Sequence, residues 1–363
     1  DNCRLSDKYK GYFYLSYLCD EIIREFFRTS LYFSGRLRYL RTVSYFCAQN
    51  ERMMTDDKKL SGHLALLGAN VIFGLNMPIS KTVLSLDFVT PYTLNLFRMG
   101  GAAVLFWIAS LFCRREKVPL RDVLLLFAAS LFGVQLNQVS FLIGLSMTAP
   151  VDASIVATTV PIITMIISAL YLKEPITWKK VIGVLVGASG AIMLITGGQG
   201  ASGGESHLAG NLLCLLSAAS FATYLVLFKK LIGRYSSVTL MKWMFLFAAL
   251  CNLTFCWDDF ISTDFSRFTW DVSLRVAYVV CGATFLSYML IPVGQRTLRP
   301  TVVSMYNYVQ PLVASLVAVL IGLDSMNWVK GVAAVLVFSG VYIVTLSKSR
   351  AQLEAERAAR TKV

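Results

Sequence analysis

The sequence predicts an all-α polytopic membrane protein with ten transmembrane helices, arranged as a 5+5 inverted-topology repeat. Of 363 residues, 56% are hydrophobic and only 15% are charged, with a mean hydropathy of +0.62. A soluble domain has about a quarter of its residues charged. The apolar residues also gather in blocks of about 20, the length that spans a bilayer core. Finally, motifs of the first half recur in the second half.

Residues 1–52 differ from the rest of the chain. Aromatic residues alternate with Arg, no apolar run is long enough to span a bilayer, and the segment lacks the apolar core and cleavage site of a signal peptide. An interfacial amphipathic segment is one interpretation. We prefer another, in which this segment is not native and the protein starts at Met53 or Met54. Residues 1–59 are therefore expected to be an N-terminal extension, non-native or disordered.

Ten apolar blocks follow. The first five belong to a repeat over 60–197 and the last five to a repeat over 208–347, followed by a basic tail over 348–363. Block boundaries are expected to hold within a few residues. The blocks cover residues 64–84, 92–112, 122–144, 151–172, 179–196, 208–228, 238–257, 273–295, 301–321 and 328–347.

The distribution of Lys and Arg between the blocks predicts the orientation. The loops after even-numbered blocks hold Arg114, Arg115, Lys117, Arg121, Lys173, Lys179, Lys180, Lys229, Lys230, Arg234, Arg296 and Arg299. The loops after odd-numbered blocks hold only Arg267. Because short cytoplasmic loops carry the excess of Lys and Arg, the even-numbered loops and both termini are expected on the cytoplasmic side.

An internal repeat relates the two halves. At an offset of 150, the first half matches the second at Gly144/Gly294, Pro150/Pro300, Ser154/Ser304, Pro161/Pro311, Trp178/Trp328, Lys180/Lys330 and Gly190/Gly340. The first and sixth blocks match at an offset of 148, with Gly62/Gly210, Phe73/Phe221 and Lys81/Lys229. Each half has five spans, so the second half is expected to have the opposite orientation, as in many secondary transporters.

These motifs resemble the EamA family of the drug/metabolite transporter superfamily. The resemblance covers about residues 60–347 and rests on Phe73-Gly74, Arg98, Ala153-Ser154, Pro161, Leu172-Lys173-Glu174-Pro175, Trp178, Gly183, Gly187, Gly190, Ser304, Tyr308, Pro311 and Asp324. Asp324 departs from the Glu usual in the family, and residues 1–52 have no counterpart there. The resemblance implies ten helices, an inverted duplication and a central cavity, and it says little about the substrate.

Polar residues within the apolar blocks are the candidate cavity residues. Amides and phenols are costly toward lipid and are therefore expected to point inward. Interhelical hydrogen bonding is the alternative role for each of them. The set is Asn76, Gln135, Asn137, Gln138, Ser154, Thr158, Tyr224, Tyr288, Ser304, Asn307 and Tyr308.

Pro161 and Pro311 match across the repeat in mid-block, where a proline leaves a backbone carbonyl without its helical partner. In lipid that carbonyl must face protein or a water-filled cavity, so these prolines are expected to mark hinges or kinks beside the cavity.

Arg98 and a stripe of glycines can each be interpreted in two ways. Arg98 would suit an anionic substrate, but its nearness to Pro91 favours a side chain that extends to the membrane interface. The stripe Gly183, Gly187 and Gly190 permits close helix contact, which we expect within one chain rather than between two.

A secondary active transporter that exports a small metabolite, amino acid or drug-like solute is the leading functional interpretation. An integral membrane enzyme and a passive channel are the alternatives, although the two histidines lie far apart and no charged constriction ring is evident. We expect no cofactor, no metal and no nucleic-acid partner, and place the chain in the bacterial inner membrane. The eight cysteines lack metal-ligand spacing and are expected to be reduced. Coupling to a proton or counter-solute, and the oligomeric state, are left open.

Overall fold

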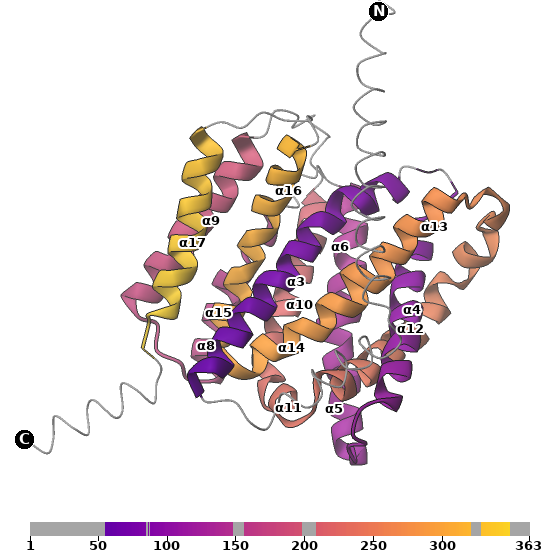
Figure 1. The fold of residues 1–363 in the computed structure, drawn as a ribbon. Helices are drawn as coiled ribbons and strands as arrows, with labels where there is room; N and C mark the ends of the chain where they lie inside the picture. The colour runs from indigo at the N-terminus through magenta and orange to yellow at the C-terminus, as the bar shows by residue number, and fades with distance from the viewer. Residues whose placement is uncertain are drawn as a thin grey trace, which may run out of the picture.

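The computed structural model describes residues 55–84, 86, 88–147, 156–197, 208–320 and 328–348. Within these residues the regular structure is entirely helical (Figure 1). The N-terminal extension up to residue 54, Ser154, Asp324 and the basic tail beyond Lys348 lie outside them. The α-helices are α3 (Thr55–Leu84), α4 (Pro91–Leu111), α5 (Leu120–Ser130), α6 (Leu136–Met147), α8 (Val160–Tyr171), α9 (Trp178–Gly197), α10 (Leu208–Leu227), α11 (Lys229–Arg234), α12 (Ser237–Ser262), α13 (Trp270–Ala277), α14 (Ser287–Thr297), α15 (Pro300–Met305), α16 (Val309–Leu320) and α17 (Trp328–Thr345).

Helices cover each expected apolar block in the described part of the chain. Six helical stretches there are long and apolar enough to cross a membrane. They are Pro91–Leu111, Leu120–Gly144, Leu208–Leu227, Ser237–Ser262, Trp270–Thr297 and Trp328–Thr345. Helix α8 is apolar but shorter, because a turn at Thr158 and Thr159 separates it from the helical residues before it. The count of ten spans therefore stays a prediction.

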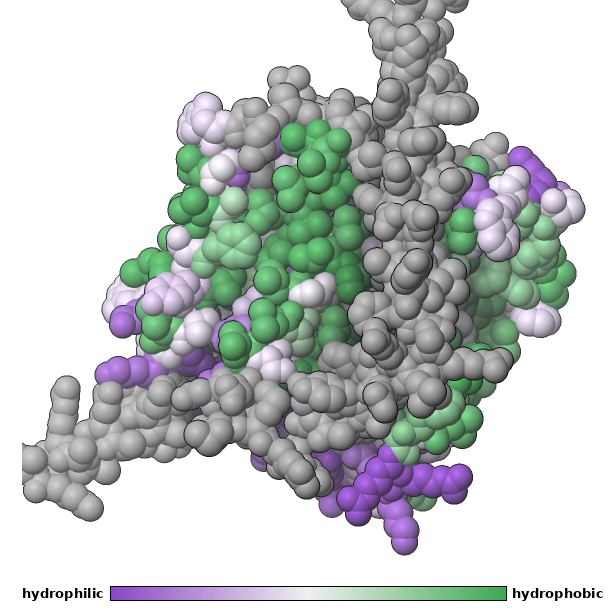
Figure 2. Space-filling view, viewed as in Figure 1, coloured by the Kyte–Doolittle hydropathy of each residue, from purple (hydrophilic) through white to green (hydrophobic). Residues whose placement is uncertain are grey.

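The surface is what a lipid environment requires. Large apolar side chains such as Leu170, Phe255 and Val335 are between 65% and 78% exposed. Figure 2 shows apolar residues over the middle of the visible face, with hydrophilic residues gathered at its lower end, near α5 and α11 in Figure 1. In water such a surface would aggregate, whereas in a bilayer the hydrocarbon chains cover it.

The helices pack in pairs that recur in the two halves. Helix α9 packs on α17, and α4 packs on α12. Helix α6 packs on α10 as α14 packs on α3, and α8 packs on α10 as α16 packs on α3. If α3, α6 and α8 correspond to α10, α14 and α16, these are the pairings that a twofold axis between two repeats would produce.

Both halves also carry a π-helix at the same place. The π-helix η1 (Leu131–Gln135) joins α5 to α6, and η3 (Tyr278–Leu286) joins α13 to α14. Shifted by the repeat offset of 150, η1 falls within η3. π-Helices are rare and frequently lie at functional sites. The residues just after the two π-helices, which include Gln138 and Tyr288, are therefore candidates for a functional site.

Short polar contacts fasten the loops at one end of the bundle. Asp122, 3% exposed, accepts hydrogen bonds of 2.5 Å from Arg234 Nη1 and from the Tyr235 hydroxyl. Burial and this bond to Asp122 raise the pKa of Tyr235 above its ordinary value. The Glu116 carboxylate accepts from the backbone N–H of Ser236, the residue that caps α12.

Cysteine chemistry differs from the expectation at one position. Cys113, just after α4, is disulfide-bonded, and its partner lies outside the described residues. The cysteines at 214, 251, 256 and 281 are free thiols, as predicted.

Candidate functional site

Two hydrogen bonds join residues that are separated by the repeat offset itself. Gln138 Nε2 on α6 donates to the Tyr288 hydroxyl on α14 at 3.1 Å, over a separation of 150 residues. The Tyr308 hydroxyl donates to the Thr158 carbonyl at 3.0 Å, over the same separation. Residues at equivalent positions of two repeats touch only where they lie on the axis between them. These four residues therefore mark the axis that relates the two repeats.

The surroundings of Tyr288 are aromatic and closely packed. Its ring meets Phe245 edge-on at 4.9 Å between centroids and Phe73 at 5.9 Å. Tyr288 is 5% exposed. Edge-on aromatic contacts hold the ring in one orientation, so the hydroxyl is presented to Gln138 in a fixed position.

The surroundings of Tyr308 depend on a glycine. Tyr308 is 1% exposed and its ring lies against Gly187 of α9, where an added Cβ would come within 2.8 Å of the ring. The carbonyl that its hydroxyl reaches belongs to a turn at Thr158 and Thr159, just before α8. The second axial contact thus involves irregular backbone rather than a regular helix.

The helices are interrupted just before both repeat-matched prolines. Pro161 is the second residue of α8 and follows that turn. Pro311 is the third residue of α16 and follows the 3₁₀ turn η4 (Tyr306–Tyr308). The sequence places these prolines in mid-block, and the structure begins a new helical segment at each. The reason is that a proline is well accommodated in a first helical turn, where its N–H is not needed.

The other expected cavity residues make interhelical or local hydrogen bonds. Asn137 Nδ2 donates to the Ser217 hydroxyl at 3.0 Å, and the Tyr224 hydroxyl donates to Gln295 Oε1 at 3.2 Å. Ser304 is fully buried and donates to the Thr301 carbonyl, while Asn76 accepts from Ser80. These bonds are the alternative role foreseen for such residues.

Asn307 stands apart from this set. It is partly exposed, and its side-chain amide makes no hydrogen bond within the described residues. It lies in η4, one residue before Tyr308. Among the expected amide residues that the structure describes, Asn307 is therefore the one whose side chain makes no hydrogen bond to any described residue, so a solute could use both its N–H groups and its oxygen without the loss of a protein contact.

A polar chain that the sequence analysis missed crosses the bundle nearby. Asn95 Nδ2 on α4 donates to Asn252 Oδ1 on α12 at 2.8 Å, and Asn252 Nδ2 donates to Gln135 Oε1 at 2.5 Å. Asn252 is fully buried. The signal is a lone amide in an apolar block, but only Gln135 of the three is among the predicted cavity residues.

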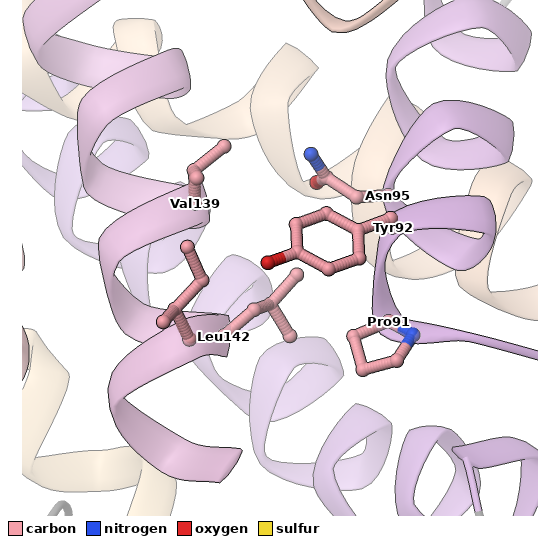
Figure 3. A pocket seen from close by; sticks show the side chains of 6 residues that line it. Pro91, Tyr92, Asn95, Val139 and Leu142 are labelled. Carbon is pink, nitrogen blue, oxygen red and sulfur yellow. The ribbon is translucent and has the colours of Figure 1, made fainter. Parts of the chain in front are cut away.

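The pocket in Figure 3 lies beside this chain and includes Asn95 in its lining. Tyr92 and Asn95 enter it from α4, and Val139 and Leu142 face them from α6. Its lining contains none of the expected cavity residues and is mostly apolar. We therefore assign this pocket no chemical role.

Arg98 does not extend to the interface as expected. It is 7% exposed, its Nε donates to the Thr284 hydroxyl at 3.1 Å, and its Nη1 donates to Gln138 Oε1 at 3.1 Å. Gln138 therefore contacts both Arg98 and Tyr288. The guanidinium lies directly beside the first axial contact.

Comparison with known proteins settles the family. Residues 60–196 and 208–346 each match the EamA-like transporter family. The chain belongs to this family. Two matches in one chain also establish that the EamA unit is present twice.

Several of the relatives are named as transporters. The EamA protein described here is 25% identical over 297 residues to the uncharacterized transporter YetK of Bacillus subtilis, covering 81% of this chain and 89% of YetK. It is 25% identical over 282 residues to a WAT1-related protein of Arabidopsis thaliana, covering 70% of this chain and 74% of that protein. One solved crystal structure matches with a TM-score of 0.64 at 18% identity, over 80% of this chain and 98% of the other, which shows a common fold. The chain is a multi-pass membrane protein of a transporter family.

Proposed function

We propose that this EamA protein is a secondary active transporter that exports a small metabolite, amino acid or drug-like solute. Transport proceeds by alternating access through a polar cavity between two inverted five-helix halves, repeats 60–197 and 208–347. The chain lies in the bacterial inner membrane with both termini in the cytoplasm, and a proton or counter-solute gradient drives it.

The observation that carries this proposal is the pair of axial contacts. Gln138–Tyr288 and Thr158–Tyr308 join the two halves by single hydrogen bonds at equivalent positions. A hydrogen bond contributes a net ~0.5–1.5 kcal/mol, so such contacts break and re-form at little cost when two halves rock. In an inverted repeat a pseudo-twofold rotation relates the two halves, so exchanging their conformations converts an inward-open state into an outward-open one, which is the basis of alternating access in such folds.

A flux measurement tests the proposal. The full chain is reconstituted in liposomes loaded with a bacterial metabolite extract, and the release of each compound is followed by mass spectrometry with and without an imposed pH gradient. Protein-dependent release of one or a few compounds, accelerated by a gradient of protons or of a second solute, is expected. Release of all small compounds at gradient-independent rates would instead indicate a channel.

Reporter fusions test the orientation. Lys229 lies within electrostatic reach of Glu174, Lys180 and Arg299, so three of the basic loops share one end of the bundle. At the other end, Arg267 lies over the Phe88 ring at 4.5 Å. Fusions after Lys117, Lys180 and Lys230 should report a cytoplasmic location, and fusions within 197–204 and 258–267 an external one. A single reversed fusion within this series would contradict the ten-span topology.

Substituting two asparagines distinguishes an amide that binds the solute from an amide that holds helices together. Asn307→Ala should lower the transport rate about 10-fold, equivalent to ~1.4 kcal/mol, because it removes donors that only a solute uses. Its melting temperature should stay that of the unsubstituted chain. Asn252→Ala should lower the melting temperature instead, since Asn252 bonds to Asn95, Gln135 and the Ala248 carbonyl. If Asn307→Ala melts as early as Asn252→Ala, both amides serve to hold helices together.

A further inference from the structure

Arg98 is a buried cation in the membrane-spanning core. It lies in the second turn of α4, among buried apolar residues that include Met99 and Ala102. Both of its protein partners, the Thr284 hydroxyl and the Gln138 amide, are neutral. A charge within the hydrocarbon region is costly and is therefore a default sign of a functional site.

The other buried cations with described contacts are compensated differently. Lys180 pairs with Glu174 at 2.7 Å, and Arg275 pairs with Asp271 at 2.9 Å. Arg299, which is only partly buried, donates to the Ser347 carbonyl at a helix end, at 2.6 Å. Arg98 has no ion pair with any described residue. Because a buried charge without a counter-charge costs several kcal/mol, an anion supplied from outside the chain would lower the energy of this state.

The donors that remain on Arg98 suit one kind of anion. The Thr284 hydroxyl donates to the Val279 carbonyl inside η3 and accepts from Nε, so that side of the guanidinium is occupied. Nη2 makes no hydrogen bond within the described residues, and Nη1 uses one of its two protons on Gln138. The free N–H groups on Nη1 and Nη2 form the planar fork that binds a carboxylate through two parallel bonds.

Gln138 connects this fork to the axis. Its Oε1 accepts from Arg98 while its Nε2 donates to Tyr288. A bond from guanidinium to carboxylate is stronger than one to a neutral amide. A carboxylate bound to the free N–H groups of Arg98 would therefore lie next to Gln138, weaken the neighbouring Arg98–Gln138 bond and disturb the contact between the two halves.

We propose that Arg98 is the counter-ion for a carboxylate group of the transported solute, so that the substrate class is an organic carboxylic acid. That this carboxylate belongs to a solute that the protein transports rests on the proposed function. A carboxylate fits better than a phosphate, because one cation with neutral neighbours balances a single negative charge.

Thermal melting of the full chain in detergent tests the inference before the solute is identified. The probes are three acid–amide pairs of matched shape, namely benzoate and benzamide, succinate and succinamide, and N-acetyl-leucine and N-acetyl-leucinamide, with inorganic phosphate as a separate probe. The variants are Arg98→Gln and Arg98→Lys. Arg115→Gln, in an exposed loop, is the control.

At least one acid should raise the melting temperature of the unsubstituted chain and of Arg115→Gln by several degrees, while its amide should not. Arg98→Gln should lose this shift and should melt, without ligand, no earlier than the unsubstituted chain, because it removes an unpaired buried charge. Arg98→Lys should keep a smaller shift.

Four results would overturn the inference. They are no shift with any acid, equal shifts with acid and amide, a shift with phosphate alone, and an Arg98→Gln variant that melts early yet keeps the acid-dependent shift. Flux through liposomes separates the two proposals. Flux of neutral or cationic solutes without flux of acids leaves the transporter function standing and removes the carboxylate site. An Arg98-dependent melting shift without flux of any solute leaves the carboxylate site standing and removes the transporter function.

Discussion

Replacing Gly340 with alanine should lower the free energy of unfolding by about 3 kcal/mol, because the new methyl group has no space between α9 and α17. A Cβ at Gly340 would lie 2.5 Å from the Gly187 backbone nitrogen and 2.6 Å from the Gly183 carbonyl oxygen. Both neighbours are backbone atoms, which cannot move aside as a flexible side chain can. The helices must separate, and the close contact of small residues that holds membrane helices together is lost.

The glycine equivalent to Gly340 in the first repeat gives a second variant to test, and another glycine on α17 gives a control. A Cβ added at Gly190, the equivalent of Gly340, would lie 2.8 Å from the Ala333 carbonyl oxygen, so Gly190→Ala should be similarly destabilising. An added Cβ at Gly331, also on α17, meets nothing within 4 Å. Gly331→Ala should therefore leave stability unchanged or raise it by up to ~1 kcal/mol through helix propensity. Melting in detergent gives all three values. Equal behaviour of Gly331→Ala and Gly340→Ala would show that the α9–α17 contact does not hold the fold.

Several parts of the fold could be predicted from the sequence. A bilayer has a fixed thickness and forbids unpaired backbone groups, so apolar blocks of the right length must be helices. The glycines and prolines that match across the repeat also lie at structurally equivalent positions. Gly190 and Gly340 both lie in the contact between α9 and α17, and Pro161 and Pro311 each lie in the first turn of a new helical segment. These features depend on residue type and spacing alone.

The polar contacts could not be predicted in the same way. Hydropathy predicts that a segment is a helix but not which face of that helix contacts another helix. The sequence therefore favours a position at the membrane interface for the Arg98 side chain, which is in fact buried. The π-helices η1 and η3 arise from packing and have no sequence signature, yet they rotate the residues that follow them. The partners of Gln138, Tyr288 and Asn252 are likewise set by how the helices turn toward each other.

Cysteine placed at Asn307 should react with a hydrophilic thiol reagent about 100-fold faster than cysteine at Val317, in a background without the native cysteines. Asn307 is partly exposed and its amide has no described partner, whereas Val317 is 8% exposed within α16. Only a thiolate reacts, and exclusion of water can lower the thiolate fraction by several powers of ten. The rate of labelling thus reports water at each position.

Thr158 and Tyr308 distinguish a rigid bundle from one that alternates. In the structure both residues are buried, so cysteines at these positions should react as slowly as one at Val317 while the halves stay together. A cysteine at 158 keeps the backbone carbonyl to which Tyr308 donates, whereas a cysteine at 308 removes that hydrogen bond and reports burial alone. If the halves rock, the Thr158–Tyr308 contact opens part of the time and labelling should proceed at a measurable intermediate rate. A solute that binds one state more tightly should then change this rate, because it shifts the population of that state. Labelling at 158 and 308 that stays as slow as at Val317 under every gradient would mean that the axial contacts never open, and alternating access at this axis would be wrong.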